Sequence, residues 1–380
     1  MKNKVYITSL HMKHGGIEMA ITLLANALVN RGYEVEILNT YRIGEPAYEL
    51  DDRVQVTYLT DVQPNREAFQ AAVQCKNPAK MLKEGLYAVK VLYLKKKTMK
   101  EKIKEIQSGV ILATRNDHAV LLSRYGNSGV HKIAQLHHDH QFEKGILKDF
   151  RENYGNIDEF VVLTDQLQQE IKEIMKDNHH TKVLVIPNFL PKVECKASGV
   201  RKKQMIAVGR LHEVKGFLRL IDLWNTFSKE TDVCLKIIGD GEQHQRLKEK
   251  IQTLGLEGKV ILTGAMDHSQ VMEEMSQSLA YVMTSFTEAF PYVLLEAMSA
   301  GLPVIAFDVR VGPRAIITDG KDGFLVEDGN ETMFIEKLRI LLESDNLREE
   351  MSRKAVEKVQ RFSEEEVLKL WEPLLDQTEV

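Results

Sequence analysis

The 380-residue chain has only three cysteines, and this excludes two kinds of site. Cys75, Cys195 and Cys234 are far apart, odd in number and form no C-x-x-C pair. Neither a disulfide framework nor a thiolate zinc site is therefore expected. A reducing, cytoplasmic compartment fits this cysteine usage best.

The chain also lacks a long hydrophobic run. No stretch approaches the ~20 uncharged apolar residues of a membrane-spanning helix. The apolar run after Lys4 is interrupted by Thr8, Ser9 and His11, which makes it too short for the core of a signal peptide. We therefore expect a protein that neither crosses a membrane nor is secreted by the usual route.

An excess of positive charge is absent as well. Lys and Arg number 51 against 55 Asp and Glu, a formal charge of -4, so no global positive field draws the chain to nucleic acid. There is no G-x-x-x-x-G-K-[ST] loop, and no G-x-G-x-x-G follows the first predicted strand. A general nucleic-acid binder and a P-loop enzyme are excluded.

What is present is an alternation of short apolar runs with segments of helical period. Residues 5–7 and 34–38 have the composition of strands, and residues 16–30 between them have a helical period, which indicates a parallel sheet covered by helices. Further strands are predicted at 110–112, 133–136, 160–163 and 183–186, and in a second series at 205–208, 234–238, 260–262, 280–283 and 303–307. The sequence thus predicts an α/β protein with two doubly wound domains.

The alternation stops at Pro187, and residues 191–204 are polar, basic and aperiodic, which is typical of a linker. We predict an N-terminal domain at 1–190 and a second domain at 191–361. Residues 362–375 have the pattern of an amphipathic helix, and the segment 362–380 is predicted to pack back on the first domain. Ligands of such sheets bind at the carboxyl ends of strands, so we expect the chemistry in a cleft between the domains.

A loop with two basic residues follows the first strand of the second domain. Arg210 and Lys215 stand where a helix begins, and free backbone N–H groups and the helix dipole favour an anion there. Arginine is a rigid fork for phosphate oxygens and lysine a mobile point charge, so the pair suits a diphosphate. The alternative is a loop whose basic residues are merely solvated.

Two carboxylates eight residues apart frame the start of a later helix. Glu288 lies in the loop before a helix that is predicted to begin at Pro291, and Glu296 lies about a turn and a half inside it. Free N–H groups around Ala289 and Phe290 can hold an anion or a sugar hydroxyl between the acids. A capping acid and a buried, paired glutamate are the alternative, and for the two acids together we favour a joint site.

With these motifs the second domain resembles the retaining glycosyltransferases of family 4, which have the GT-B fold. The resemblance is carried there by GRLHEVKGF, IIGDGEQHQRL, VILTGAMDH and TSFTEAFPYVLLEAMSAGLPVIAFDVRVGPRAIITDGKDGFLV, and in the first domain by HGGIEMAITLLANALVNRGYEVEIL, FVVLTDQLQQEI and VIPNF. It covers essentially the whole chain and implies two Rossmann-like domains that face each other across a cleft.

The resemblance implies a role for each motif. Arg210 and Lys215 match the clamp on the donor diphosphate, Glu288 the acid that hydrogen-bonds the transferred sugar, and Glu296 the acid that holds the nucleotide ribose. Ala289 stands where many members have glycine, which narrows the space near the sugar. The predicted donor-binding set also includes Gly15, Gly16, Gly209, Ala289 and Phe290.

In the first domain the resemblance points to a glycine loop and a histidine. Gly15 and Gly16 match the loop where the backbone approaches the donor phosphate. His137, after the strand 133–136, fits the histidine that contacts the donor sugar, with His138 and His140 as rivals. A metal site on this cluster is the alternative. No metal is expected, because consecutive side chains point in different directions and the family uses basic residues in place of a cation.

The segment 79–106 holds nine lysines against three glutamates. Its apolar residues have roughly helical spacing, so we predict a helix with one apolar and one cationic face. These apolar residues are Met81, Leu82, Leu86, Val89, Leu92 and Tyr93. One interpretation is a surface helix of the first domain, and the other is contact of Lys80–Lys104 with an anionic membrane surface.

The residues and the resemblance together predict a retaining glycosyltransferase that moves a hexose-type sugar from a nucleoside diphosphate, UDP, to a hydroxyl of a cell-surface glycan or lipid-linked acceptor. Arg210 and Lys215 would stabilise the leaving diphosphate, so no cofactor or metal is expected. The expected location is the cytoplasm, peripheral on the inner face of the membrane. A sugar-nucleotide epimerase or hydrolase of the same fold and a non-catalytic accessory subunit are the alternatives.

Overall fold

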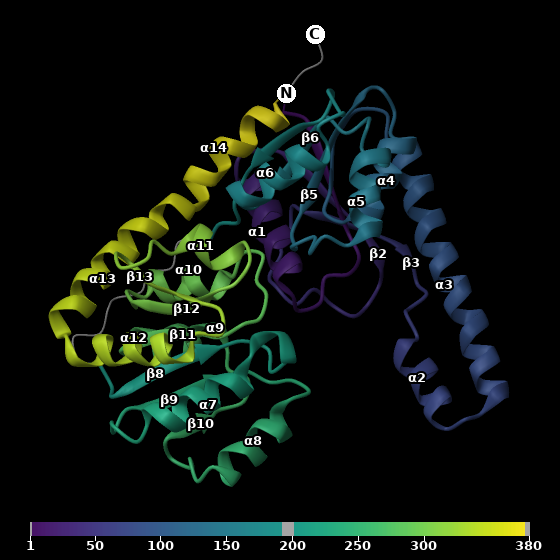
Figure 1. Cartoon of the computed structure of the whole chain (residues 1–380). Helices are drawn as coiled ribbons and strands as arrows, with labels where there is room; N and C mark the ends of the chain where they lie inside the picture. Colours follow the sequence, from purple (N-terminus) through teal and green to yellow (C-terminus); the bar gives the residue numbers. More distant parts are fainter. Residues whose placement is uncertain (1, 192–200, 377–380) are drawn as a thin grey trace. The chain divides into compact units, whose positions relative to one another are not determined.

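A computed structural model describes residues 2–191 and 201–376, which form two compact units. Unit 1 takes in the described residues of 1–163, 167–186 and 368–380, and unit 2 those of 164–166 and 187–367. Each unit has its own parallel β-sheet (Figure 1). The predicted fold class, two doubly wound α/β domains in tandem, is confirmed.

Unit 1 is built on a seven-stranded sheet in the order β3-β2-β1-β4-β5-β6-β7, with parallel pairing throughout. Its strands are β1 (Lys4–Ser9), β2 (Glu34–Tyr41), β3 (Gln55–Thr60), β4 (Gly109–Ala113), β5 (Val130–Leu136), β6 (Glu159–Val162) and β7 (Lys182–Val185). Its helices are α1 (Gly16–Asn30), α2 (Arg66–Gln74), α3 (Pro78–Glu105), α4 (Asn116–Tyr125), α5 (Lys144–Asn153), most of α6 (Asp165–Ile174) and the later part of α14 (Glu364–Leu375).

The residues of α14 from 368 onward pack within unit 1, far from their neighbours in sequence. Trp371 is buried, the Tyr33 hydroxyl donates to Asp376 Oδ1 at 2.7 Å, and Arg31 forms an ion pair with Glu372 at 3.4 Å. Asn3 Nδ2 donates to the carbonyl of Leu375 at 2.8 Å. The amphipathic pattern around Trp371 therefore buries its apolar side against residues near the beginning of the chain.

Unit 2 has a six-stranded parallel sheet in the order β10-β9-β8-β11-β12-β13. Its strands are β8 (Gln204–Val208), β9 (Cys234–Ile238), β10 (Val260–Leu262), β11 (Ala280–Met283), β12 (Val304–Asp308) and β13 (Gly323–Glu327). Its helical elements are η1 (Glu213–Lys215), α7 (Phe217–Phe227), α8 (His244–Thr253), α9 (His268–Ser276), α10 (Tyr292–Ser299), α11 (Gly312–Ile316), α12 (Glu331–Glu343), α13 (Asp345–Val359) and η2 (Gln360–Phe362).

Helices cover both faces of these sheets, so the strands are buried apolar runs rather than alternating ones. All four residues of β11 are buried, and Val5 and Ile7 of β1 have no exposed surface. The core of unit 2 includes the rings of Phe307 and Phe334, whose centroids are 4.6 Å apart. This continuous burial is why the runs were visible in the sequence.

Most predicted strands agree with the structure, and β9, β10 and β11 agree residue for residue. The strand predicted at 303–307 lies one residue later, and β3 and β13 were not predicted. Of the predicted linker 191–204, residues 192–200 lie outside the described residues, as does Cys195. Cys75 and Cys234 are free thiols.

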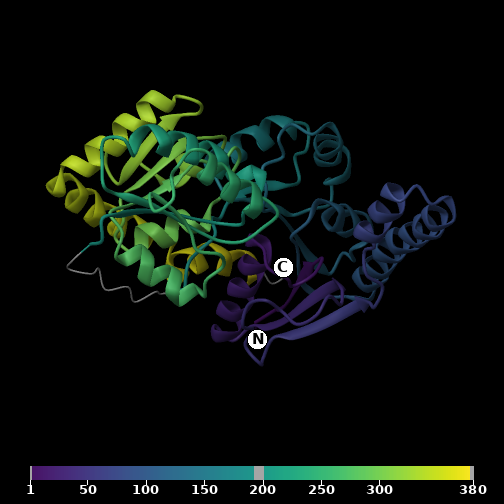
Figure 2. The same cartoon turned by 90° about the horizontal axis from the view of Figure 1, so that it is seen from below.

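Helices α2 and α3 form a hairpin in the connection from β3 to β4, which Figure 2 shows from below as two adjacent rods. The Asn77 side chain caps α3 by accepting from the backbone N–H of Lys80, and Pro78 occupies its first position. The buried residues of α3 are Val91, Met99 and Ile103, which lie in its C-terminal half. Among the described residues, no helix is both long and apolar enough to cross a membrane.

Candidate active site

The strand order of unit 2 turns between β8 and β11, the switch point at which such sheets bind ligands. Two hydrogen bonds join the loops that follow these strands: Phe286 N donates to Val214 O at 2.8 Å, and Thr284 Oγ1 donates to Gly216 O at 3.0 Å. Gly216 has a φ of 65°, and a Cβ there would lie 2.0 Å from the carbonyl oxygen of Thr284. Only glycine therefore lets the two loops approach this closely.

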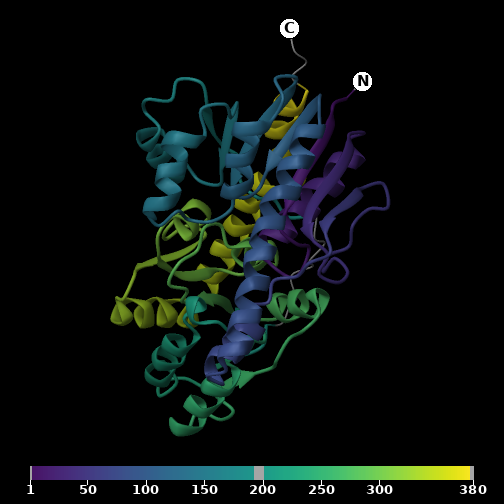
Figure 3. The same cartoon turned by 90° about the vertical axis from the view of Figure 1, so that its right-hand side faces the viewer.

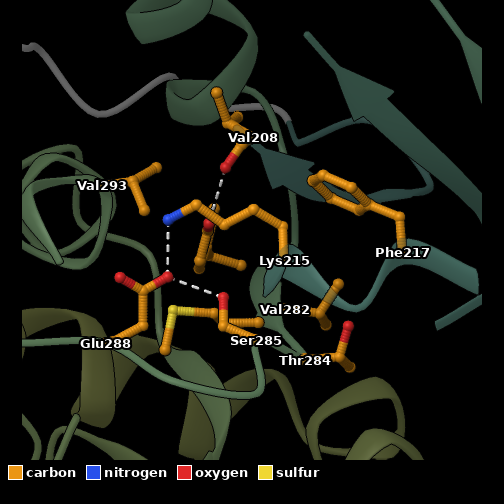
Figure 4. A pocket seen from close by; sticks show the side chains of 10 residues that line it. Val208, Lys215, Phe217, Val282, Thr284, Ser285, Glu288 and Val293 are labelled. Carbon is orange, nitrogen blue, oxygen red and sulfur yellow. Dashed lines mark hydrogen bonds and ion pairs between the residues drawn. The ribbon is translucent and has the colours of Figure 1, made fainter. Parts of the chain in front are cut away.

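This close approach brings Lys215 to Glu288. Lys215 Nζ lies 2.6 Å from Glu288 Oε1, and the same oxygen accepts a hydrogen bond from Ser285 Oγ at 2.7 Å (Figure 4). The side chain of Glu288 is 10% exposed and that of Lys215 29%. The structure thus places two of the predicted residues in one small pocket, as a charge-assisted cluster whose geometry is fixed from both sides.

The loop after Glu288 leaves backbone donors free. In the described part of the chain, the N–H groups of Ala289 and Phe290 have no hydrogen-bond acceptor. The ring of Phe290 is buried against Phe362, with centroids 5.6 Å apart, so only its backbone is available to a ligand. Helix α10 begins at Tyr292, one residue later than predicted, with Pro291 as its N-cap.

A strained turn supports the backbone of Glu288. Gly312 N donates to Glu288 O at 2.9 Å and also to Arg310 O at 3.1 Å, which closes a γ-turn centred on Val311. Val311 is buried and has φ 64° and ψ -55°, a conformation that a β-branched residue rarely adopts. Such strain persists only where the surrounding structure imposes it, and it is concentrated at functional sites.

The second predicted carboxylate, Glu296, lies on α10 and is buried. Its Oε1 lies 3.1 Å from Nε2 of His268, the first residue of α9, and this hydrogen bond raises the pKa of His268. Burial, and then the charges of Glu288 and Glu296, raise the pKa of Tyr281, whose hydroxyl donates to the carbonyl of Val208 at 3.2 Å. Both predicted acids therefore lie within electrostatic range of one buried hydroxyl.

Arg210 lies in the loop after β8, just beyond Gly209, and is exposed. Its side chain contacts no acidic group in the residues that the structure describes. An unpaired, exposed guanidinium beside the Lys215 pocket remains available to an anionic ligand. The predicted roles of Arg210 and Gly209 in binding a diphosphate stay predictions.

An arginine that the sequence did not single out holds the loop of Glu288. Arg219, on α7, donates to the carbonyl oxygens of Thr284 and Ser285, and its guanidinium lies 4.2 Å from the ring centroid of Phe286 and 4.3 Å from that of Phe307. Its remaining nitrogen pairs with an exposed aspartate. Arg219 is therefore a positioning residue for the loop that carries Ser285 and Glu288.

We expect Arg219→Lys to lower the melting temperature of unit 2 by about 3–10 °C, because each lost hydrogen bond from a charged donor costs about 1.5–3 kcal/mol and a unit of this size loses about 2–4 °C per kcal/mol. A lysine cannot reach both carbonyls or stack between two rings. Calorimetry checks the shift, and kcat should fall about tenfold as the loop loosens. Arg246→Lys, at an exposed site on α8, is the matched control. An Arg219 variant with unchanged melting temperature and kcat would remove this role.

In unit 1, Gly15 and Gly16 lie in the loop between β1 and α1, at the point where the strand order of that sheet turns. The carboxylate of Glu18 folds back over this loop: its Oε2 lies 2.1 Å from where a Cβ of Gly15 would be. The N-terminus of α1 thus already has a carboxylate of its own chain beside it, while Gly16 faces open space. Donor binding by the two glycines stays a prediction.

His137 directly follows β5 and differs from the histidines beside it. Burial lowers its pKa to about 3, so the ring is neutral at pH 7, and neither ring nitrogen has a partner among the described residues. His140 is fully buried and its Nε2 lies 3.0 Å from Glu170. Burial also lowers the pKa of His138. Of the three, His137 offers the free donor and acceptor that a sugar hydroxyl would use.

Sequence reasoning missed Ser285, Arg219 and His268. Ser285 lies three residues before Glu288, and this short spacing was its only signal. Arg219 and His268 lie on other helices, and their contacts depend on the strand order. Among the described residues, no three His, Cys, Asp or Glu side chains gather closely enough to hold a metal ion.

Comparison with known proteins identifies the second half of the chain. Residues 194–358 match the model of the family described as glycosyl transferases group 1. An exopolysaccharide phosphotransferase of Streptomyces coelicolor is 29% identical over 377 residues, which are 95% of this chain but 39% of that protein. The amylovoran biosynthesis glycosyltransferase AmsD of Erwinia amylovora is 28% identical over 374 residues, covering 95% of this chain and 96% of the relative.

Among solved structures, S. aureus TarM in complex with fondaparinux, alpha-GlcNAc-glycerol and UDP is similar to this chain with a TM-score of 0.77 and 16% identity. The match covers 99% of this chain and 100% of TarM. Together with the two parallel sheets, this likeness confirms the predicted GT-B fold class with its two Rossmann-like domains.

Proposed function

We propose that this glycosyltransferase, whose residues 194–358 form a group 1 domain, transfers a hexose-type sugar from a UDP-sugar to a hydroxyl of a glycan or lipid-linked acceptor, with retention at the anomeric carbon. One observation carries the proposal. The ion pair of Lys215 and Glu288, fixed by Ser285, lies at the carboxyl ends of β8 and β11, where a doubly wound sheet binds its ligand.

The proposed mechanism rests on charge. Breaking the bond between the sugar and the diphosphate leaves its electron pair on a phosphate oxygen, and the fixed charges of Arg210 and Lys215 stabilise that growing negative charge. Glu288 orients the hydroxyls of the sugar while its own position is held by Lys215. The acceptor oxygen attacks the anomeric carbon from the leaving-group side, and its proton passes to an oxygen of the leaving diphosphate.

The choice of donor and acceptor is supported by the relatives. The TarM structure contains UDP, and the names of two relatives refer to exopolysaccharide and to amylovoran biosynthesis. Because this chain spans only 39% of the Streptomyces coelicolor protein, the phosphotransferase activity in that name is not carried over. A cell-surface or lipid-linked acceptor would place the reaction in the cytoplasm, at the inner face of the membrane.

The two alternatives make different products. A sugar-nucleotide epimerase or hydrolase would consume the donor with no acceptor present. A non-catalytic accessory subunit is expected to have lost part of the charged set, but Arg210, Lys215, Glu288 and Glu296 are all present, and two of them form the cluster described above. A transferase therefore accounts for the site better than either alternative.

The direct test is a thermal-shift panel of nucleoside diphosphates and their sugars. UDP at about 100 times its Kd is expected to add about 2.7 kcal/mol of stability, which corresponds to roughly 5–11 °C in a unit of this size. ADP, GDP and their sugars are the controls and should shift the melting temperature less. If no nucleotide stabilises the chain, or if a bound UDP-sugar is turned over equally fast without any acceptor, the proposed transfer reaction is wrong.

A further inference from the structure

The hairpin of α2 and α3 concentrates positive charge that the rest of the chain lacks. Residues 66–105 contain eleven Lys and Arg against four Glu, which leaves 40 basic against 51 acidic residues for the remainder. The residues assigned to the transfer reaction all lie outside this hairpin. The hairpin therefore has a surface chemistry of its own that the proposed reaction does not explain.

One side of α3 carries a row of exposed apolar side chains. Leu82, Leu86, Val89 and Tyr93 recur every three or four residues, so they share a face, and they are 67%, 65%, 64% and 61% exposed. Figure 3 shows α3 along its whole length. Scattered apolar residues are normal on a surface, but a contiguous row marks a site of interaction.

Lysines continue this row toward the C-terminus of α3. Lys96, Lys100 and Lys104 follow Tyr93 at the same spacing and therefore lie on the same face. The prediction that the apolar and cationic residues occupy separate faces is thus wrong: they succeed each other along one face. We call this row the α3 stripe: Leu82, Leu86, Val89, Tyr93, Lys96, Lys100 and Lys104.

The lysines of the α3 stripe are available to an external anion. Within the described residues, Lys96, Lys100 and Lys104 meet no acidic side chain. Lys100 and Lys104 instead lie over the ring of Tyr125, 4.4 and 5.7 Å from its centroid, which steadies the side chains without neutralising them.

We propose that the α3 stripe is a docking surface for an anionic lipid membrane. Its apolar half would enter the boundary between headgroups and acyl chains, its lysines would meet headgroup phosphates, and Tyr93 between them suits the interface. A second copy of the chain fits poorly. Two paired stripes would bring Lys96 and Lys100 against lysines or apolar residues of the other copy, with no acid to meet them.

The proposal stands on unit 1 alone and does not depend on the transfer reaction. Its test is co-sedimentation of the full chain with vesicles of phosphatidylcholine, with or without about one third phosphatidylglycerol. We expect binding to the anionic vesicles only, and release as salt shortens the reach of charges from about 10 Å at 0.1 M to about 3 Å at 1 M. Equal binding to both kinds of vesicle would overturn the proposal.

Two sets of variants test the stripe itself. One lysine at an anionic surface strengthens binding roughly fivefold, so replacing three is expected to weaken vesicle binding about a hundredfold. The stripe variant combines Lys96→Gln, Lys100→Gln and Lys104→Gln. The matched control combines Lys229→Gln, Lys248→Gln and Lys321→Gln, which removes the same charge from exposed sites of unit 2. Equal loss in both sets, or in neither, would reject the stripe.

The apolar half has its own variant, Leu82→Gln with Leu86→Gln. Both side chains are exposed, so the fold is expected to survive, which circular dichroism checks. Binding to anionic vesicles should weaken at least tenfold, because two leucines no longer leave water. Light scattering without lipid covers the other occupant. A mass that rises with protein concentration, and that this variant lowers to the monomer value, would show that the stripe binds a second copy instead.

Discussion

Replacing Lys215 by alanine is expected to lower kcat by about a hundredfold or more, the scale of removing one preorganised group that stabilises charge in the transition state. The ammonium acts twice in the proposed site. It would meet the leaving diphosphate, and it holds Glu288 at 2.6 Å. Its loss therefore also leaves a largely buried carboxylate with a single partner, Ser285.

Arg210→Ala is the informative companion, with a similar expected fall in kcat. Because Arg210 is exposed and has no acidic partner in the described chain, its removal should leave the melting temperature unchanged, whereas Lys215→Ala should lower it. Lys248→Ala, at an exposed site on α8, controls for loss of charge. A folded Lys215 or Arg210 variant with near wild-type turnover would show that the diphosphate clamp is misassigned.

Glu288→Gln and Glu296→Gln are expected to fail in different ways. The glutamine at 288 still accepts hydrogen bonds from Lys215 and Ser285 but has no charge, so kcat should fall about a hundredfold while the Kd for UDP changes little. The glutamine at 296 weakens a contact to the ribose in ground and transition states alike, so the Kd for UDP should rise about tenfold or more.

Titration calorimetry with UDP and steady-state kinetics separate the two variants. Glu249→Gln, on the exposed face of α8, is the control for removing a carboxylate. Loss of UDP binding in Glu288→Gln with normal binding in Glu296→Gln would mean that the two roles are reversed. Normal binding and rate in both variants would remove the joint site.

How far the sequence predicts the fold depends on how completely each strand is buried. Strands in the middle of a covered parallel sheet are continuous apolar runs, and β11, with all residues buried, was predicted without error. The two missed strands, β3 and β13, are both at the edges of their sheets. In β3 no residue is fully buried, and its polar Gln55, Thr57 and Thr60 obscure the pattern.

The site divides along a similar line. Lys215, Glu288 and Glu296 belong to local spacing patterns that the sequence displays directly. The contacts that position them come from elements far away in the chain: Arg219 lies more than 60 residues before the carbonyls it holds, and His268 lies 28 residues before Glu296. Such contacts follow from the order of strands in the sheet, which single-sequence periodicity does not give.

The hairpin shows the opposite limit. Its helix was predicted from spacing alone, but the assignment of faces was wrong, because the apolar residues Leu82, Leu86 and Val89 turned out to be exposed while Val91 and Met99 are buried. Apolar residues lie on more than one side of α3, so periodicity shows that a helix forms but does not show which side the rest of the unit covers.

The packing of α14 in unit 1 has a consequence for the order in which the chain is completed during synthesis. Unit 2 is almost continuous in sequence, from 187 to 367, whereas unit 1 needs residues from 368 onward. At roughly 5–20 residues per second, the intervening stretch of about 180 residues takes on the order of ten seconds or more to emerge. During that time the surface around Tyr33 that receives α14 stays open to solvent and to chaperones. The unit that is begun first is thus finished last, and a nascent chain interrupted near residue 367 would carry a whole unit 2 beside an incomplete unit 1.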